Sequence, residues 1–256
     1  MANNDYIIYG VNPVLEKLKA SAKDISELLI AEGAERTSLR QIILEAKRLG
    51  LTLLPVSSRI LDRLAGGQKH QGVVARIAAY RYLPFDDLLQ QVAASSGSSW
   101  ILVLDGVTDP RNFGALLRTA EAVGVNYIII PKDRSVEVTP LVVKASAGAA
   151  HHINISRVTN LRRTIRELKQ HNYWTVGLDS QGRNSIYDKT YPDRLVIVLG
   201  SEGHGIRPIN LRECDFIVSI PMLGKVGSLN VSVAGAVFLY ELLRQRQRRG
   251  VDLVRT

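Results

Sequence analysis

The chain has 256 residues, of which 46% are apolar, and a formal net charge of +9. No apolar run approaches the roughly 20 residues of a membrane-spanning helix and the polar start lacks the layout of a signal peptide, so we expect a soluble, cytoplasmic protein. The single cysteine, Cys214, excludes an internal disulfide and a cysteine-rich zinc site. The basic charge is typical of a protein with a polyanionic partner, RNA or DNA, and also of a merely solubilising surface.

Residues 1–80 have the pattern of a small α/β unit. Helices and strands alternate in it, with helices expected at 13–20, 38–49 and 57–64 and strands at 25–31, 51–56 and 72–80. A short helix and a tract rich in serine and glycine come next, so we expect a linker at 81–99.

From residue 100 onward the pattern is that of a mostly parallel sheet with helices on its faces. The continuous apolar run ILVL at 101–104 predicts a strand that is buried on both sides. Further strands are expected at 127–130, 152–155, 173–178, 195–200 and 216–221, and helices are expected to begin near residues 112, 139, 159, 208 and 231.

Common nucleotide-binding and hydrolytic signatures are missing from this second part. The segment 177–184 has the glycine spacing of a P-loop, but Arg183 and Asn184 replace the lysine and the hydroxyl residue that the motif needs. The glycines of GSEGHGI (200–206) have the wrong order for a dinucleotide fingerprint. No motif predicts a metal site.

Three polar stretches follow apolar strands and are the candidates for a functional site. They are DGVTDPRNFGALLRTAEAVGV (105–125), VLGSEGHGI (198–206) and IPMLGKVGSLNVSVAGAVFLYEL (220–242). Ligands bind at the carboxyl ends of strands in open α/β sheets, so we expect these stretches to converge on one pocket. In the last stretch we expect Gly224 and Gly227 to adopt positive φ, and Asn230 to cap the helix that follows.

These stretches resemble the three motifs of the SpoU/TrmH branch of the SPOUT RNA methyltransferases, over residues 100–248. The first 80 residues are similar to the substrate-binding domain that often precedes this catalytic domain, and the whole layout is most similar to members that methylate a guanosine ribose in 23S rRNA. The resemblance implies a substrate-binding domain at 1–80, a catalytic domain at 100–256 and S-adenosylmethionine as cofactor. It also implies a deep trefoil knot, although most chains are unknotted.

The resemblance also assigns roles to individual residues. The cofactor-binding positions, which act mostly through backbone groups, are Gly200, Ile220 and Leu229. The catalytic positions are Arg118, Asn112, Glu202, Ser228 and Asn230. A guanidinium holds its proton in proteins, which makes Arg118 a poor base, so we expect it to clamp the target phosphate and hydroxyl, with base action secondary. The other four would position Arg118, the ribose or the loop. The helix carrying Asn112 and Arg118 and the last helix would form a homodimer interface.

Other functions remain open at this stage. The target could be a tRNA, which is disfavoured because such relatives usually lack the N-terminal domain, or an rRNA adenosine. The chain could also be an RNA-binding protein that kept the fold without the activity. The sequence does not distinguish naked 23S rRNA from a ribosome precursor as the substrate.

Overall fold

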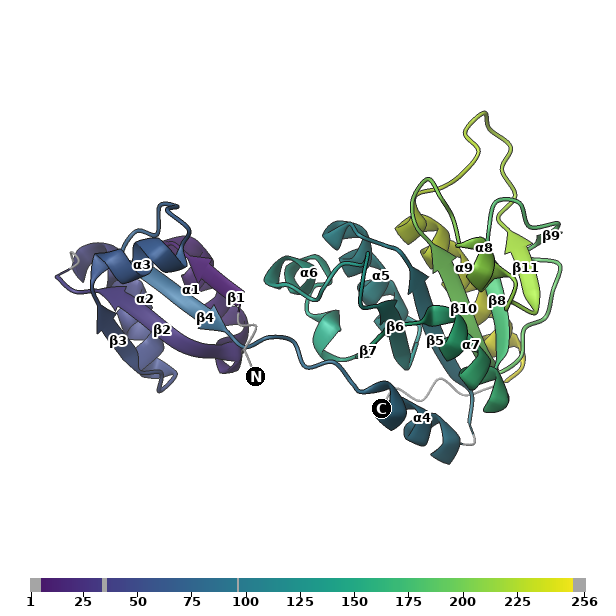
Figure 1. Ribbon diagram of the computed structural model, residues 1–256, viewed down its shortest axis with the longest axis horizontal. Coiled ribbons are helices and arrows are strands. Elements are labelled where there is room, and N and C mark those ends of the chain that lie inside the picture. The colour runs from purple at the N-terminus through teal and green to yellow at the C-terminus, as the bar shows by residue number, and fades with distance from the viewer. Residues whose placement is uncertain (1–5, 34–35, 96, 251–256) are drawn as a thin grey trace. The chain divides into compact units, whose positions relative to one another are not determined.

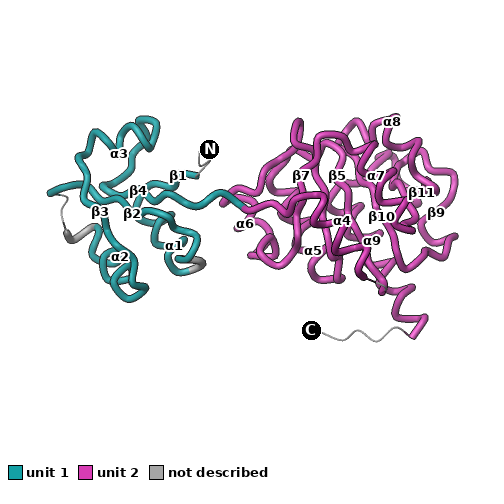
Figure 2. The backbone as a smooth tube through the Cα atoms, turned by 60° about the horizontal axis from the view of Figure 1, so that its bottom comes forward, with its two compact units in different colours: residues 1–80 teal, residues 81–256 magenta. Residues whose placement is uncertain are grey.

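The computed structural model describes residues 6–33, 36–95 and 97–250. The chain divides into two compact units, residues 1–80 and 81–256 (Figure 2). Each unit has its own sheet and its own core.

The first unit is a four-stranded sheet with helices on both faces (Figure 1). Its strand order is β1-β4-β2-β3, in which only the β2–β3 pair is parallel. The strands are β1 (Tyr6–Tyr9), β2 (Ile25–Ala31), β3 (Leu53–Val56) and β4 (Val73–Ile77), and the helices are α1 (Val11–Ser21), α2 (Arg36–Arg48) and α3 (Ser58–Leu64). Leu28 packs in the core with α1 and α2, whereas its neighbour Leu29 packs with Leu61 of α3 on the other face. Strand alternation thus explains why the helices divide between the two faces.

The second unit contains a seven-stranded sheet in the order β7-β6-β5-β10-β8-β11-β9, and every paired neighbour is parallel. Its strands are β5 (Ser99–Asp105), β6 (Tyr127–Pro131), β7 (Asn154–Val158), β8 (Trp174–Leu178), β9 (Asn184–Ser185), β10 (Arg194–Gly200) and β11 (Phe216–Ser219). All seven residues of β5 are buried, as the apolar run predicted. The expected parallel α/β architecture is confirmed, whereas β1 and the two-residue β9 were not predicted.

Helices cover both faces of this sheet. They are α4 (Phe85–Ala94), α5 (Pro110–Ala122), α6 (Pro140–Ala145), α7 (Leu161–Gln170), α8 (Pro208–Leu211) and α9 (Val231–Arg248). Side chains of α4 and α7 pack on one face with Val196 and Val198 of β10. On the other face, Gly235 of α9 lies against Leu116 of α5 and Leu199 of β10, where an added methyl group would come within 2.5 and 2.8 Å of those side chains.

Helix α4 lies within the range 81–99 that we expected to be a linker. Its Leu88 and Val92 are buried in the core of the second unit, and the backbone N–H of Leu83 donates to the carbonyl of Ile155 in β7. Most of this stretch therefore packs as part of the second unit.

A buried carboxylate fastens the C-terminal part of α9. Glu241 is 5% exposed and accepts hydrogen bonds from Arg244 and Gln245. Gln245 also donates to the carbonyl of Lys189 and accepts from the backbone N–H of Tyr191, which ties the helix to the segment before β10. The hydrogen bond from Arg244 is the main cause that lowers the pKa of Glu241.

Strand β10 lies between β5 and β8, although both precede it in the chain. The trefoil knot stays a prediction, since strand order alone does not define one. Within the described ranges, no helix is long and apolar enough to span a membrane. Those same ranges hold no cluster of three histidine, cysteine or acidic side chains that could bind a metal ion.

Candidate active site

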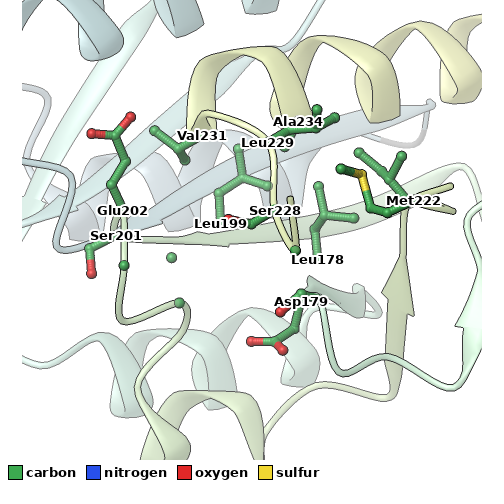
Figure 3. Close-up of a pocket in the computed structure, with 16 residues that line it drawn as sticks. Leu178, Asp179, Leu199, Ser201, Glu202, Met222, Ser228, Leu229, Val231 and Ala234 are labelled. Atoms are coloured by element: carbon green, nitrogen blue, oxygen red, sulfur yellow. The ribbon is translucent and has the colours of Figure 1, made fainter. Parts of the chain in front are cut away.

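A pocket opens at the carboxyl ends of the central strands of the second unit (Figure 3). Open α/β sheets form ligand sites at the carboxyl ends of their strands, and this pocket lies at those of β8, β10 and β11. The pocket holds about 790 Å³ of space, including its open mouth. Its walls come from the end of β8, the end of β10, the loop after β11 and the start of α9, and its lining residues are Leu178, Asp179, Ser180, Leu199, Gly200, Ser201, Glu202, Gly203, Gly205, Ile220, Met222, Gly227, Ser228, Leu229, Val231 and Ala234.

Five of the eight predicted site residues line this pocket. They comprise all three expected cofactor-binding positions, Gly200, Ile220 and Leu229, and two expected catalytic positions, Glu202 and Ser228. Two of the three polar stretches, 198–206 and 220–242, therefore both contribute residues to this pocket.

The first polar stretch reaches the other two through side-chain hydrogen bonds. Asn112 on α5 donates from Nδ2 to Oε1 of Glu202 over 2.8 Å. Asn230 donates from Nδ2 to the same Glu202 oxygen and to Oδ1 of Asn112. We call Asn112, Glu202 and Asn230 the amide–carboxylate cluster. Each of its members comes from a different predicted motif, so the three stretches meet at this cluster, although no residue of 105–125 lines the pocket itself.

Asn230 also caps α9, as its sequence position predicted. Its Oδ1 accepts from the backbone N–H of Ser232 at 2.9 Å and from that of Val233 at 3.4 Å. The capping oxygen and the donating nitrogen belong to one amide, so forming the helix start also orients the amide for Glu202. Helix capping and assembly of the cluster are thus linked through one side chain.

The loop that carries Glu202 turns back sharply on itself. The backbones of Ser201 and Gly205 exchange two hydrogen bonds of 3.0 Å. A methyl group on Gly200 would overlap the backbone of Gly205 and Ile206, so only glycine fits at that position. The close approach of the two backbones holds the turn at the pocket wall.

A buried carboxylate that the sequence reasoning missed anchors the far end of this loop. Asp105 ends β5 with a fully buried side chain. Its Oδ1 accepts from Nε of Arg207 at 2.6 Å, and its Oδ2 accepts from the backbone N–H of Arg207 at 2.9 Å and from Nδ2 of Asn210 at 2.7 Å. The loop is therefore held both by β10 and by a residue about 100 positions earlier in the chain. The position of Asp105 directly after the apolar run 101–104 was the signal that could have singled it out.

Arg118 lies apart from the pocket. It is exposed on α5, whereas Leu116 and Ala120 of the same helix are buried. It does not line the pocket, and no hydrogen bond or ion pair joins its side chain to another residue in the described part of the chain. Its side chain is therefore free to reach a ligand or another molecule.

In the pocket loops, one sequence expectation is wrong and one lining residue was missed. Gly224 and Gly227 do not have positive φ, so neither needs to be glycine for that reason, and both face open space. Asp179 was overlooked because it belongs to the segment that failed the P-loop test, yet it lines the pocket. Its position at the end of strand β8, beside β10, is the signal that could have found it.

Comparison with known families gives two matches that together span most of the chain. A model described as the SpoU rRNA Methylase family matches residues 99–240. A second model, described as RNA 2′-O ribose methyltransferase substrate binding, matches residues 7–83.

Individual proteins and structures agree with these matches. The chain is 42% identical over 247 residues to YacO of Bacillus subtilis, a TrmH family protein whose name leaves its target open between tRNA and rRNA, with 96% of this chain and 98% of that protein covered. It is 42% identical over 240 residues to the 23S rRNA (guanosine-2′-O-)-methyltransferase RlmB of Haemophilus influenzae, covering 93% and 97%. The structure of the SpoU methyltransferase AviRb from Streptomyces viridochromogenes with AdoMet aligns with a TM-score of 0.67 at 21% identity, covering 95% of this chain and 91% of that one. A crystal structure of an RNA 2′-O ribose methyltransferase aligns with a TM-score of 0.62 at 27% identity, covering 96% and 90%.

Proposed function

The chain belongs to the SpoU rRNA methylase family, and on that premise we propose that it methylates the ribose 2′-hydroxyl of a guanosine in 23S rRNA, with S-adenosylmethionine as the methyl donor. The observation that carries the proposal is the amide–carboxylate cluster beside the pocket, because it joins all three motifs at the carboxyl edge of the parallel sheet. Relatives named as 23S rRNA guanosine methyltransferases support the choice of target.

The pocket suits the chemistry of this donor. S-adenosylmethionine, when bound, supplies a methyl group activated by the positive charge on its sulfur. Leucine, isoleucine and methionine side chains give the pocket apolar surface for a purine ring, and its glycines leave backbone groups accessible to ring nitrogens. The residues present therefore fit the donor. Gly200, Ile220 and Leu229 would hold it, mostly through backbone atoms.

The polar residues at the pocket would orient the acceptor. Oε1 of Glu202 is occupied by the amides of Asn112 and Asn230, which fixes the carboxylate and leaves Oε2 able to accept from an incoming hydroxyl. Ser228 lies on the pocket wall and would position the ribose or the loop. Arg118, with its free guanidinium, would clamp the target phosphate and hydroxyl, because a guanidinium matches phosphate geometry and rarely loses its proton.

The two units would divide the work. We place RNA binding in residues 1–80, in agreement with the substrate-binding model that matches there, and catalysis in residues 100–256. The substrate would be free 23S rRNA or a ribosome precursor, so the reaction would take place in the cytoplasm.

A homodimer would form through α5 and α9. Support comes from an apolar stripe on α9, where Val233 is 48% and Tyr240 is 53% exposed and the partly exposed Val237 lies between them. Residues spaced by three and four share one face of a helix, so these side chains make a continuous surface that a second copy could cover.

Methyl transfer from labelled S-adenosylmethionine tests the proposal. We expect incorporation at a guanosine 2′-hydroxyl when the enzyme is given 23S rRNA from a strain that lacks the modification, and none with tRNA. No transfer to any RNA would refute the activity, and transfer only to tRNA or to an adenosine would refute the target.

Arg118→Ala separates binding from transfer. Because Arg118 does not line the pocket, the variant should bind S-adenosylmethionine with normal affinity in calorimetry, yet transfer should fall about 100-fold or more. Arg212→Ala removes the same charge from an exposed position of the same unit and should behave like the unaltered protein. A normal rate in Arg118→Ala would contradict the clamp role.

A further inference from the structure

The pocket differs in charge from the chain around it. The protein carries a net charge of +9, yet the charged side chains among the described pocket-lining residues are two carboxylates, Asp179 and Glu202, with no lysine, arginine or histidine. A pocket of this kind favours a positively charged ligand over a neutral one of the same shape.

Of the two pocket carboxylates, Asp179 is the one that receives no hydrogen bond from a side chain of the described residues. The amides of Asn112 and Asn230 donate to Glu202, whereas no cation of the described chain pairs with Asp179. Its hydrogen-bond partner is the backbone N–H of Gln181, which donates to Oδ1 at 2.9 Å. The Asp179 carboxylate is therefore a half-buried negative charge with no cation of the described residues paired to it.

The backbone holds Asp179 firmly at the pocket wall. Its own N–H donates to the carbonyl of Val218 in β11 at 2.9 Å, which continues the pairing of β8 with β11. Its Oδ2 comes so close to Gly205 that a methyl group there would be 3.0 Å away. In Figure 3 the side chain lies across from Leu229 and Ala234, so the carboxylate forms the wall opposite the start of α9. The protein alone thus fixes the orientation of the Asp179 carboxylate, without a ligand.

We propose that Asp179 is a binding residue that distinguishes the methyl donor from the spent product by charge. The proposal rests on the function proposed above. In the transfer, the S–CH3 bond breaks with its electrons remaining on sulfur, an O–CH3 bond forms, and the hydroxyl proton is released. The sulfonium charge is lost in this step, so S-adenosylhomocysteine carries one positive charge less than the donor. A fixed carboxylate therefore stabilises the donor more than the product and favours exchange of one for the other after each turnover.

Calorimetric titration of Asp179→Asn with three ligands tests this role. The ligands are S-adenosylmethionine, S-adenosylhomocysteine and sinefungin, in which a protonated amine takes the place of the sulfonium methyl group. Because asparagine keeps an oxygen for Gln181, the fold should persist, and binding of the neutral product by the variant checks that the pocket is intact. We expect affinity for both cationic ligands to fall about fivefold, the size of one partly exposed charge interaction, and affinity for the neutral product to change less than about twofold.

A matched control and two adverse outcomes complete the design. Asp133→Asn removes the same charge from an exposed position of the same unit and should leave all three affinities unchanged. Equal weakening of all three ligands, or no change in any of them, would overturn the proposal. Failure of the underlying function would look different, since the unaltered protein would then bind none of the three.

Discussion

Replacing Asp105 with alanine should destabilise the second unit without touching the pocket surface directly. Asp105 is fully buried and accepts three hydrogen bonds, from Nε and the backbone N–H of Arg207 and from the amide of Asn210. Asn210 is 2% exposed, so its amide would lose its partner without gaining water. The Arg207 side chain is 47% exposed and would rehydrate.

The expected magnitude follows from these exposures. A buried donor left without a partner costs about 1–3 kcal/mol, which applies in full to the buried Asn210 amide and in part to the part-buried backbone N–H of Arg207. The variant no longer has to bury a carboxylate, which offsets part of this cost. We therefore expect the free energy of unfolding of the second unit to fall by about 3 kcal/mol. For a unit of this size each kcal/mol lowers Tm by about 2–4 °C, which gives a decrease of about 6–12 °C.

Tryptophan fluorescence isolates the relevant unit. The chain has two tryptophans, Trp100 and Trp174, and both belong to the second unit, so their thermal transition does not report on residues 1–80. Asp133→Ala, at an exposed position, is the control and should melt within about 1 °C of the unaltered protein. If Asp105→Ala also melted within about 2 °C, the buried donors would not depend on Asp105 and the reasoning would be refuted.

Three further changes test other features. Tyr240→Asp, which puts a charge on the apolar stripe of α9, should turn the dimer into a monomer in light scattering, whereas Leu44→Asp on the first unit should not; a monomeric unaltered protein would contradict the dimer. Gly200→Ala should overlap the facing backbone and weaken donor binding at least tenfold, whereas Gly224→Ala, in open space, should bind normally; equal affinities would argue against the tight turn. The pKa of Glu241 is lowered from 4.5, so its stabilisation is complete above that pH and is lost as the pH falls through the folded-state value. The Tm gap between Glu241→Gln and the unaltered protein should therefore shrink from pH 7 to pH 3, and a constant gap would count against the ion pair.

Most of the fold was predicted because each strand or helix has its own hydrophobic pattern, which is visible in a short run of sequence. Apolar runs located strands such as β5, and the helices expected to begin near residues 139 and 231 agree with α6 and α9. The two residues of β9 are too few to carry a periodicity, whereas β1 was not predicted although the equally short β3 and β11 were.

The site was predicted in its motifs but not in its contacts. The resemblance to the SpoU/TrmH motifs singled out Asn112, Glu202 and Asn230, and the amide–carboxylate cluster joins the three. The contact between Asp105 and Arg207 spans 102 positions, and Asp179 reaches the pocket because β8 lies beside β10 in the sheet. Such pairings depend on strand order, which no local pattern specifies.

The amide–carboxylate cluster has a consequence for the growing chain. Its members are 90 and 28 positions apart in sequence, so a ribosome that has completed every residue through Glu202 has made the sheet up to β10 but has not yet made Asn230. Folding of the earlier strands can begin during synthesis, yet the cluster cannot close until the start of α9 has emerged. A nascent or prematurely terminated chain would therefore contain most of the fold and no assembled site, so it could not carry out the transfer.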